Sequence, residues 1–185
     1  ILEGRERDVP VVGVRGQAED HCQRGPRERR NSDAAPEARE HDLSSLQTMY
    51  YGASPMSPAR LKQLRERFGE VFMQIYAASE HAGATVSMSK DEHQPDRNGD
   101  ESHLASAGRI VPGVELLIVD RQGRRVPDGL DGEIWMRSRA TCLGYLNAPE
   151  KTAEEFCDGY WKSGDYGRID ANGYVYILDR VKDTI

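Results

Sequence analysis

Asp165 is the first residue in this sequence whose type and position suggest ligand chemistry. It lies in the stretch WKSGDYGRID (161–170), between a Gly and a Tyr and in the gap between two short apolar runs. A carboxylate offers several acceptor sites, which matches the paired hydroxyls of a ribose. Gly-Asp is also ordinary turn chemistry, so this stretch alone leaves a ligand contact and a simple turn open.

A second candidate stretch is MQIYAASEHAG (73–83), an apolar run followed by small and polar residues. In α/β sheets, ligands bind at the carboxyl ends of parallel strands. There Tyr76 could stack on a flat ring, Ser79 could bond a phosphate oxygen, and Glu80 could hold a hard cation such as Mg²⁺. The alternative is a strand with Tyr76 in the core, followed by a polar loop.

Two further stretches fit the same ligand. YYGASPMSP (50–58) supplies a turn of small residues that would let a ligand approach the backbone, although it equally suits a strand-to-helix turn. LDRVKDTI (178–185) places Arg180 and Lys182 just past a strand. Arg suits ribose or phosphate contact, and a surface ion pair is the alternative for each residue.

The elements that must position these residues begin with a strand, helix and strand. LQTMYYG (46–52) reads as a buried strand and VFMQIY (71–76) as the next. Between them, Ser57 suits an N-cap, Pro58 the first helical position and Gly69 the stop. The apolar residues of this helix fall on one face: Leu61, Leu64 and Phe68. This order predicts a βαβ unit with a parallel pair.

The pattern changes after Lys90, where a polar loop (90–103) leads into short strands. Asp-Gly and Asn-Gly pairs separate these strands and mark tight reversals. The expected strands are VELLIVD, GEIWMR, YGRID and YVYILD, with a short helix at Pro149–Phe156. We expect an antiparallel sheet there, in a small barrel-like subdomain.

Composition excludes several classes of function. A net charge of -6 and a pI near 5.4 disfavour general nucleic-acid binding. No apolar run reaches the roughly 20 residues of a membrane span, and the start lacks the apolar core of a signal peptide. The three Cys form no CxxC pair, so we expect a reducing, cytoplasmic setting and no zinc site or disulfide framework. His81, His93 and His103 lack metal-ligand spacing and are expected in loops.

Residues 1–40 differ from the rest of the chain. They hold eight Arg, no Lys and nine Asp or Glu, without apolar periodicity. Such a segment buries too little surface to offset its ordering entropy, so we expect it to be largely disordered. A solvated helix face or a tail that binds a partner is the alternative.

The order and spacing of these stretches resemble those of the adenylate-forming acyl-CoA synthetases, the AMP-binding superfamily. The resemblance runs from about Ala35 to Ile185. YYGASPMSP looks like the family's adenine-contacting turn, and YAASE is similar to its aromatic-x-x-Thr-Glu motif. The block from GEIWMR to DRVKD resembles, nearly position by position, the segment from a Gly-Glu strand to the hinge.

The resemblance implies a role for each candidate residue. Asp165 would bind the ribose hydroxyls, and Tyr76 would lie against the adenine. Ser79 would contact phosphate, and Glu80 would hold Mg²⁺ in a catalytic role. The remaining residues follow the same motifs: Ala53, Ser54 and Pro55 in the adenine pocket, Arg180 on the ribose-phosphate side and Lys182 at the hinge.

The implied reaction joins a carboxylic acid, with fatty acids the expected class, to ATP and then to coenzyme A. The implied fold is α/β: part of the large N-terminal domain, with a βαβ piece (41–104), an antiparallel subdomain (105–178) and a hinge (179–185). Ile75 and Ala77 stand where many relatives have Gly. The family's phosphate loop and lysine-bearing C-terminal domain have no counterpart here, which predicts a fragment that is inactive alone.

A non-catalytic remnant that binds AMP or another protein is the alternative function. A peptide-synthetase-type adenylation domain is a third interpretation, which the absence of a following carrier domain disfavours. Unpaired sheet edges would favour self-association.

Overall fold

The structure is a computed structural model that describes residues 43–54 and 56–180. The chain divides into two units, Ile1–Ser45 and Leu46–Ile185. Only residues 43–45 of the first unit are described, so the fold below is that of the second unit. The predictions for residues 1–40, Pro55 and Lys182 lie outside the described residues.

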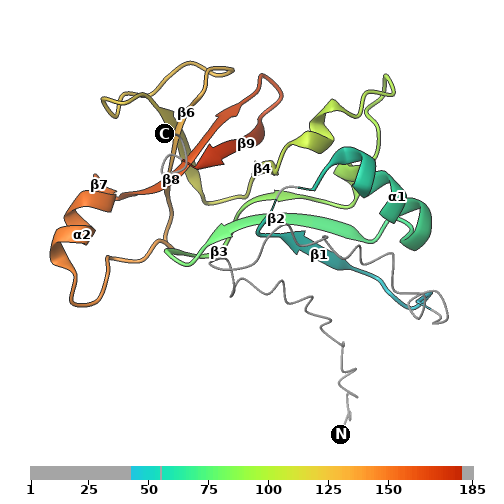
Figure 1. Ribbon diagram of the computed structural model, residues 1–185, viewed down its shortest axis with the longest axis horizontal. Helices are drawn as coiled ribbons and strands as arrows, with labels where there is room; N and C mark the ends of the chain where they lie inside the picture. Colours follow the sequence, from blue (N-terminus) through green and yellow to red (C-terminus); the bar gives the residue numbers. More distant parts are fainter. Residues whose placement is uncertain (1–42, 55, 181–185) are drawn as a thin grey trace, which may run out of the picture. The chain divides into compact units, whose positions relative to one another are not determined.

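Strands dominate the second unit and join into one nine-stranded sheet (Figure 1). Its hydrogen-bonded order is β1-β2-β3-β4-β9-β8-β6-β5, with β7 paired to β8. We expected a boundary between a βαβ piece (41–104) and an antiparallel subdomain (105–178), and the pairing of β3 with β4 joins strands from both sides of it. The division into these two parts stays a prediction. The elements are β1 (Met49–Gly52), α1 (Pro58–Phe68), β2 (Phe72–Ala78), β3 (His81–Met88), the 3-10 helices Asp91–His93 and Ser102–Ala105, β4 (Gly108–Ile110), β5 (Glu115–Val119), β6 (Gly132–Arg137), α2 (Pro149–Glu155), β7 (Phe156–Cys157), β8 (Tyr160–Ile169) and β9 (Tyr174–Arg180).

Helix α1 begins and ends where the sequence predicts. The Ser57 side chain accepts a hydrogen bond from the backbone N–H of Arg60, and Pro58 occupies the first turn. Gly69 ends the helix with a φ of 73°, which glycine adopts without the steric cost of a Cβ. Strands β1 and β2 pair in parallel on either side of this helix in sequence, so the predicted βαβ unit is confirmed.

The segment after β2 differs from the prediction. We expected the strand to end at Tyr76, but β2 continues to Ala78 and turns through Ser79 and Glu80 into β3. Strand β3 is antiparallel to β2 and was missed because HAGATVSM is rich in small residues with weak strand preference. Tertiary burial supplies what propensity does not, since Val86 and Met88 are fully buried.

The later strands confirm the predicted antiparallel sheet, with one important difference at β8. That strand begins at Tyr160 and pairs with β6 on one side and β9 on the other. Asp165 therefore lies within a strand, and the prediction that it occupies a turn is wrong. Its backbone pairs with Arg180 of β9, which holds it more closely than a surface turn would.

Two apolar clusters support the sheet. One joins α1 to β2 and β3 through Leu61, Phe72 and Met88, and Leu61 is only 1% exposed. The other lies among the later strands, with Ile134, Met136, Trp161 and Val175 at its centre. Burial of each large apolar side chain contributes about 1.5–3 kcal/mol. Of the two Trp residues, Trp161 is buried there and Trp135 is half-buried.

The three histidines were expected in loops, but all three lie in regular elements and are buried. His81, His93 and His103 are 2%, 1% and 8% exposed, and His81 opens β3. His93 Nδ1 lies 2.6 Å from the carbonyl oxygen of Ser89, which can only accept, so Nδ1 carries the proton. Desolvation of the charged imidazolium lowers the pKa of His93.

Among residues 43–54 and 56–180, no helix has both the length and the apolar character needed to cross a membrane.

Leu61→Ala tests the packing of α1. We expect a loss of about 2–5 kcal/mol in the free energy of unfolding, because the sheet beneath the helix cannot fully close the cavity. Urea denaturation followed by circular dichroism measures it. Leu143→Ala is the matched control, since Leu143 is 100% exposed and should shift stability by no more than about 0.5 kcal/mol. Equal effects of the two variants would contradict the described packing.

The buried His93 predicts a loss of stability in mild acid. Its folded-state pKa is depressed, so the unfolded chain binds a proton more readily as the pH falls below about 6.5. The free energy of unfolding should therefore fall between about pH 7.5 and about pH 5.5. Urea unfolding at both pH values measures this, and His93→Gln should flatten the dependence. An unchanged slope in that variant would rule His93 out as the cause.

Candidate functional site

The carboxyl ends of β1 and β2 lie at one edge of the sheet because the two strands run in parallel. Gly52 is opposite Ile75, so the chain leaving β1 passes the level of Tyr76. Ala53 and Ser54 follow as exposed residues, and Ala53 has a φ of 62°, an uncommon conformation for a residue with a side chain. Two of the three residues predicted for the adenine pocket thus lie at the end of the strand next to Tyr76.

A bulge in β8 sets the direction of Asp165. Between the flanking pairs, three residues of β8 (Ser163–Asp165) face the single Ile134 of β6. Gly164 has a φ of 70°, and Ser163 Oγ donates to the Ile134 carbonyl at 2.7 Å while accepting the Asp165 N–H at 3.0 Å. Bulges bend a strand and re-aim its side chains, which explains why a Ser-Gly-Asp run interrupts an otherwise regular strand.

The bulge brings Asp165 to Tyr76. The Tyr76 hydroxyl donates a hydrogen bond to Asp165 Oδ2, across 89 positions of sequence, and both side chains are partly buried. An aromatic ring and a carboxylate from distant parts of the chain therefore lie side by side, as the sequence predicts, and the function of each stays a prediction.

Ser79 and Glu80 form the two-residue turn between β2 and β3. Ser79 is exposed and Glu80 is half-buried. A loop from Ser138 to Tyr145 lines this turn, because the Cys142 N–H donates to the Glu80 carbonyl at 2.8 Å. The backbone of Glu80 is thus held by a hydrogen bond from the loop 138–145.

Tyr145 contacts the Glu80 side chain and was not singled out from the sequence. Its hydroxyl lies 2.8 Å from Glu80 Oε1 and also hydrogen-bonds Glu155 Oε2. Burial, followed by the carboxylates of Glu155 and Glu80, raises the pKa of Tyr145, so its hydroxyl remains a donor well into the alkaline range. No local pattern indicates this contact, since Glu80 and Tyr145 are 65 positions apart.

The remaining candidates are only partly described. Arg180 ends β9, where its backbone pairs with Asp165. That register places the Arg180 backbone next to that of Asp165, and the role of Arg180 on the ribose-phosphate side stays a prediction. Pro55 and Lys182 lie outside the described residues.

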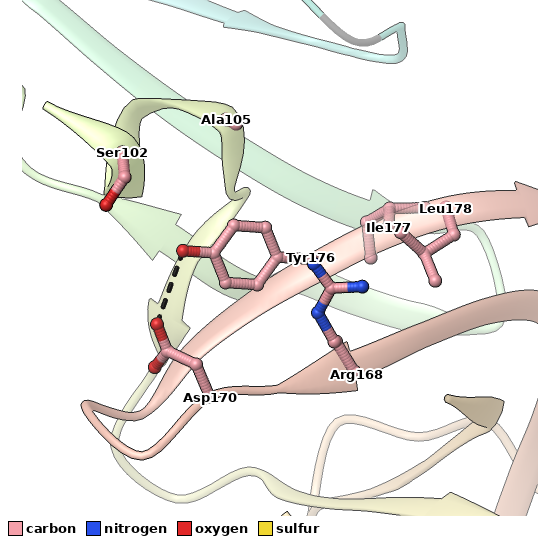
Figure 2. A pocket seen from close by; sticks show the side chains of 7 residues that line it. All are labelled: Ser102, Ala105, Arg168, Asp170, Tyr176, Ile177 and Leu178. Atoms are coloured by element: carbon pink, nitrogen blue, oxygen red, sulfur yellow. Dashed lines mark hydrogen bonds between the residues drawn. The ribbon is translucent and has the colours of Figure 1, made fainter. Parts of the chain in front are cut away.

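A surface cavity of about 460 Å³ lies elsewhere on the sheet. Figure 2 shows its lining: Ser102, Ala105, Arg168, Asp170, Tyr176, Ile177 and Leu178. The Tyr176 hydroxyl donates to Asp170 at 3.2 Å, and Arg168 pairs with Asp131 at 3.4 Å. The lining includes none of the predicted site residues, so this cavity is not our candidate site.

Within the described part of the chain, no group of three or more His, Cys, Asp or Glu side chains is arranged to hold a metal ion. Mg²⁺ takes six oxygen ligands and commonly combines one or two carboxylates with phosphate and water. A cation at Glu80 would therefore need a bound phosphate to complete its coordination.

The amino-acid sequence is similar to those of characterised acid ligases. A medium/long-chain-fatty-acid–CoA ligase of Mycobacterium tuberculosis is 39% identical over 81% of this chain and 25% of its own length. A fatty acid–[acyl-carrier-protein] ligase of Streptomyces coeruleorubidus is 36% identical over 78% of this chain and 27% of its length. The chain thus spans about a quarter of the curated relatives it matches.

Solved structures lead to the same fold. The amide bond synthetase McbA of Marinactinospora thermotolerans superposes with a TM-score of 0.72 and 36% identity, over 80% of this chain and 29% of that one. The O-succinylbenzoate coenzyme A synthetase of Bacillus subtilis, solved in complex with AMP, superposes with a TM-score of 0.68 and 26% identity. That match covers 80% of this chain and 29% of the synthetase. The described unit is an α/β piece of the large N-terminal domain of such enzymes.

The family model for AMP-binding enzymes matches residues 21–146. That match begins before residue 35, where the resemblance in the sequence motifs was expected to start. With most of the chain inside the match, this protein belongs to the AMP-binding family of adenylate-forming enzymes.

Proposed function

We propose that this chain forms the nucleotide-binding part of an ATP-dependent acid–thiol ligase. The acid's carboxylate would attack the α-phosphorus of ATP and release pyrophosphate, and the thiol of coenzyme A would then displace AMP from the acyl-adenylate. The observation that carries this proposal is the hydrogen bond between Tyr76 and Asp165. Fatty acids are the expected substrates, because a 39% identical relative is a fatty-acid–CoA ligase.

Tyr76 and Asp165 would divide the recognition of the nucleoside. The Asp165 carboxylate would accept bonds from both ribose hydroxyls, and the Tyr76 ring would lie against the adenine. The hydrogen bond between the two holds the carboxylate in one orientation before a ligand arrives, which lowers the ordering cost of binding. Ala53, Ser54 and Pro55 would close the adenine pocket from β1, and Arg180 would approach from β9.

Glu80 would hold Mg²⁺ next to the phosphate that Ser79 contacts. The residues fit this assignment, since Tyr145 uses only one acceptor site of the Glu80 carboxylate and the turn exposes the Ser79 side chain. When bound, the cation would neutralise charge that shifts among the phosphate oxygens. Lys182 would be the hinge about which the small C-terminal domain of such enzymes rotates. We also propose that the protein is cytoplasmic.

Asp165→Ala tests the proposed ribose contact. We expect AMP binding to this chain to weaken by about 1–3 kcal/mol, or roughly 5- to 150-fold in Kd, because charge-assisted bonds to the ribose are lost. Isothermal titration calorimetry with AMP measures it. Tyr76→Phe, which keeps the Asp165 carboxylate, should weaken binding less.

Asp128→Ala is the control, since Asp128 is exposed and pairs with Arg125 away from the site. A wild-type chain that binds AMP no better than Asp165→Ala would refute the nucleotide site. Formation of an acyl-CoA thioester by the chain alone would separate a complete catalyst from a module that only binds AMP.

A further inference from the structure

The hydroxyl of Tyr145 lies between two carboxylates. It hydrogen-bonds Glu80, at 2.8 Å, and also Glu155 at the end of α2. A phenol has one proton to donate, while both ionised carboxylates can only accept. Tyr145 can therefore donate to only one of them at a time, and the arrangement has two states that differ in which carboxylate accepts the hydrogen bond.

Tyr145 itself has little freedom to move. Its backbone N–H donates to Thr152 Oγ1 at 2.8 Å, and its ring meets Phe156 edge to face at 5.7 Å. The Lys151 ammonium lies 4.3 Å from the centre of the same ring. Contacts to the backbone and to the ring edge and face hold the hydroxyl at one place relative to α2.

The backbone of the Glu80 turn is held by the same loop that carries Tyr145. The Cys142 N–H bonds the Glu80 carbonyl at 2.8 Å, and the Ala82 N–H bonds the Ala140 carbonyl at 3.1 Å. Buried His81 adds a side-chain contact, with its Nε2 2.6 Å from Ser138 Oγ. Because the backbone on both sides is held, the freedom left to Glu80 lies in its side-chain torsions, and the Tyr145 hydroxyl sets those.

We propose that Tyr145 is a positioning residue for the Glu80 carboxylate, and that Glu155 receives the phenol's hydrogen bond when a divalent cation engages Glu80. This inference rests on the proposed function, in which Glu80 is a cation ligand. No bond is made or broken: the phenolic proton stays on oxygen and changes its acceptor. Glu155 thus keeps the hydroxyl satisfied in the cation-bound state, so cation binding does not leave a half-buried donor without a partner.

Mn²⁺ binding to the full chain at saturating AMP tests the proposal, with free Mn²⁺ quantified by electron paramagnetic resonance. Tyr145→Phe removes only the hydroxyl and should weaken Mn²⁺ binding about 10-fold or more, the usual effect of losing a group that orients a metal ligand. Glu155→Gln should weaken it less. The AMP affinity measured without metal should stay unchanged in both variants.

Tyr160→Phe is the matched control, because the Tyr160 hydroxyl also hydrogen-bonds a glutamate, Glu115, at 3.0 Å. A near-ultraviolet difference spectrum gives a second readout. Mn²⁺ should perturb tyrosine absorption in the wild type and in Tyr160→Phe, because the hydrogen bond of one phenol changes acceptor. Tyr145→Phe should lack that signal while melting at the wild-type temperature.

The outcomes separate this inference from the proposed function. If Glu80→Gln binds Mn²⁺ as well as the wild type does, the cation assignment itself is wrong. If Glu80→Gln loses binding while Tyr145→Phe retains wild-type affinity and the spectral change, the cation assignment stands and the positioning role of Tyr145 is overturned.

Discussion

The hydrogen bond between Tyr76 and Asp165 is the contact on which the candidate site depends. The two residues come from strands that are not neighbours, since β3, β4 and β9 separate β2 from β8 in the sheet order. Each intervening pairing must hold for the two side chains to meet. The site is therefore a property of the continuous sheet, and strands without any site residue are as necessary to it as those that carry one.

The shortest of the strands between β2 and β8 is β4, which has only three residues, Gly108–Ile110. A Cβ on Gly108 would lie 2.1 Å from the carbonyl oxygen of Ser87 in β3, and Gly108 has a φ of 106°. Both the close approach and the dihedral exclude other residues at this position. Gly108 thus lets β4 approach β3 closely, and β4 links β3 to β9 in the sheet.

The sequence was informative where one local rule determined the outcome. The Ser57 cap, Pro58 and the Gly69 stop predicted α1 because helix ends have specific side-chain chemistry. Strand β3 follows β2 after a two-residue turn, but its small residues have weak strand propensity and gave no clear pattern. The bulge at Asp165 depends on pairing with β6, which is distant in sequence, so local patterns could not reveal it. The same holds for Tyr145, whose contact with Glu80 joins a loop and a hairpin turn far apart in sequence. Asp165 was identified for its chemistry, although its strand setting was not.

Ile75 and Ala77, the two positions where the resemblance in sequence implies glycine, differ in their surroundings. Ile75 lies opposite Gly52, where an added Cβ would come within 3.3 Å of Ile75 Cγ1. The bulk of Ile75 is thus accommodated by a neighbouring residue that has no side chain. Ala77 lies in the irregular stretch of β2 past Tyr76 and is exposed. Any narrowing at the carboxyl end of β2 therefore comes from the single methyl group of Ala77, which is small enough for a ligand to pass the backbone closely.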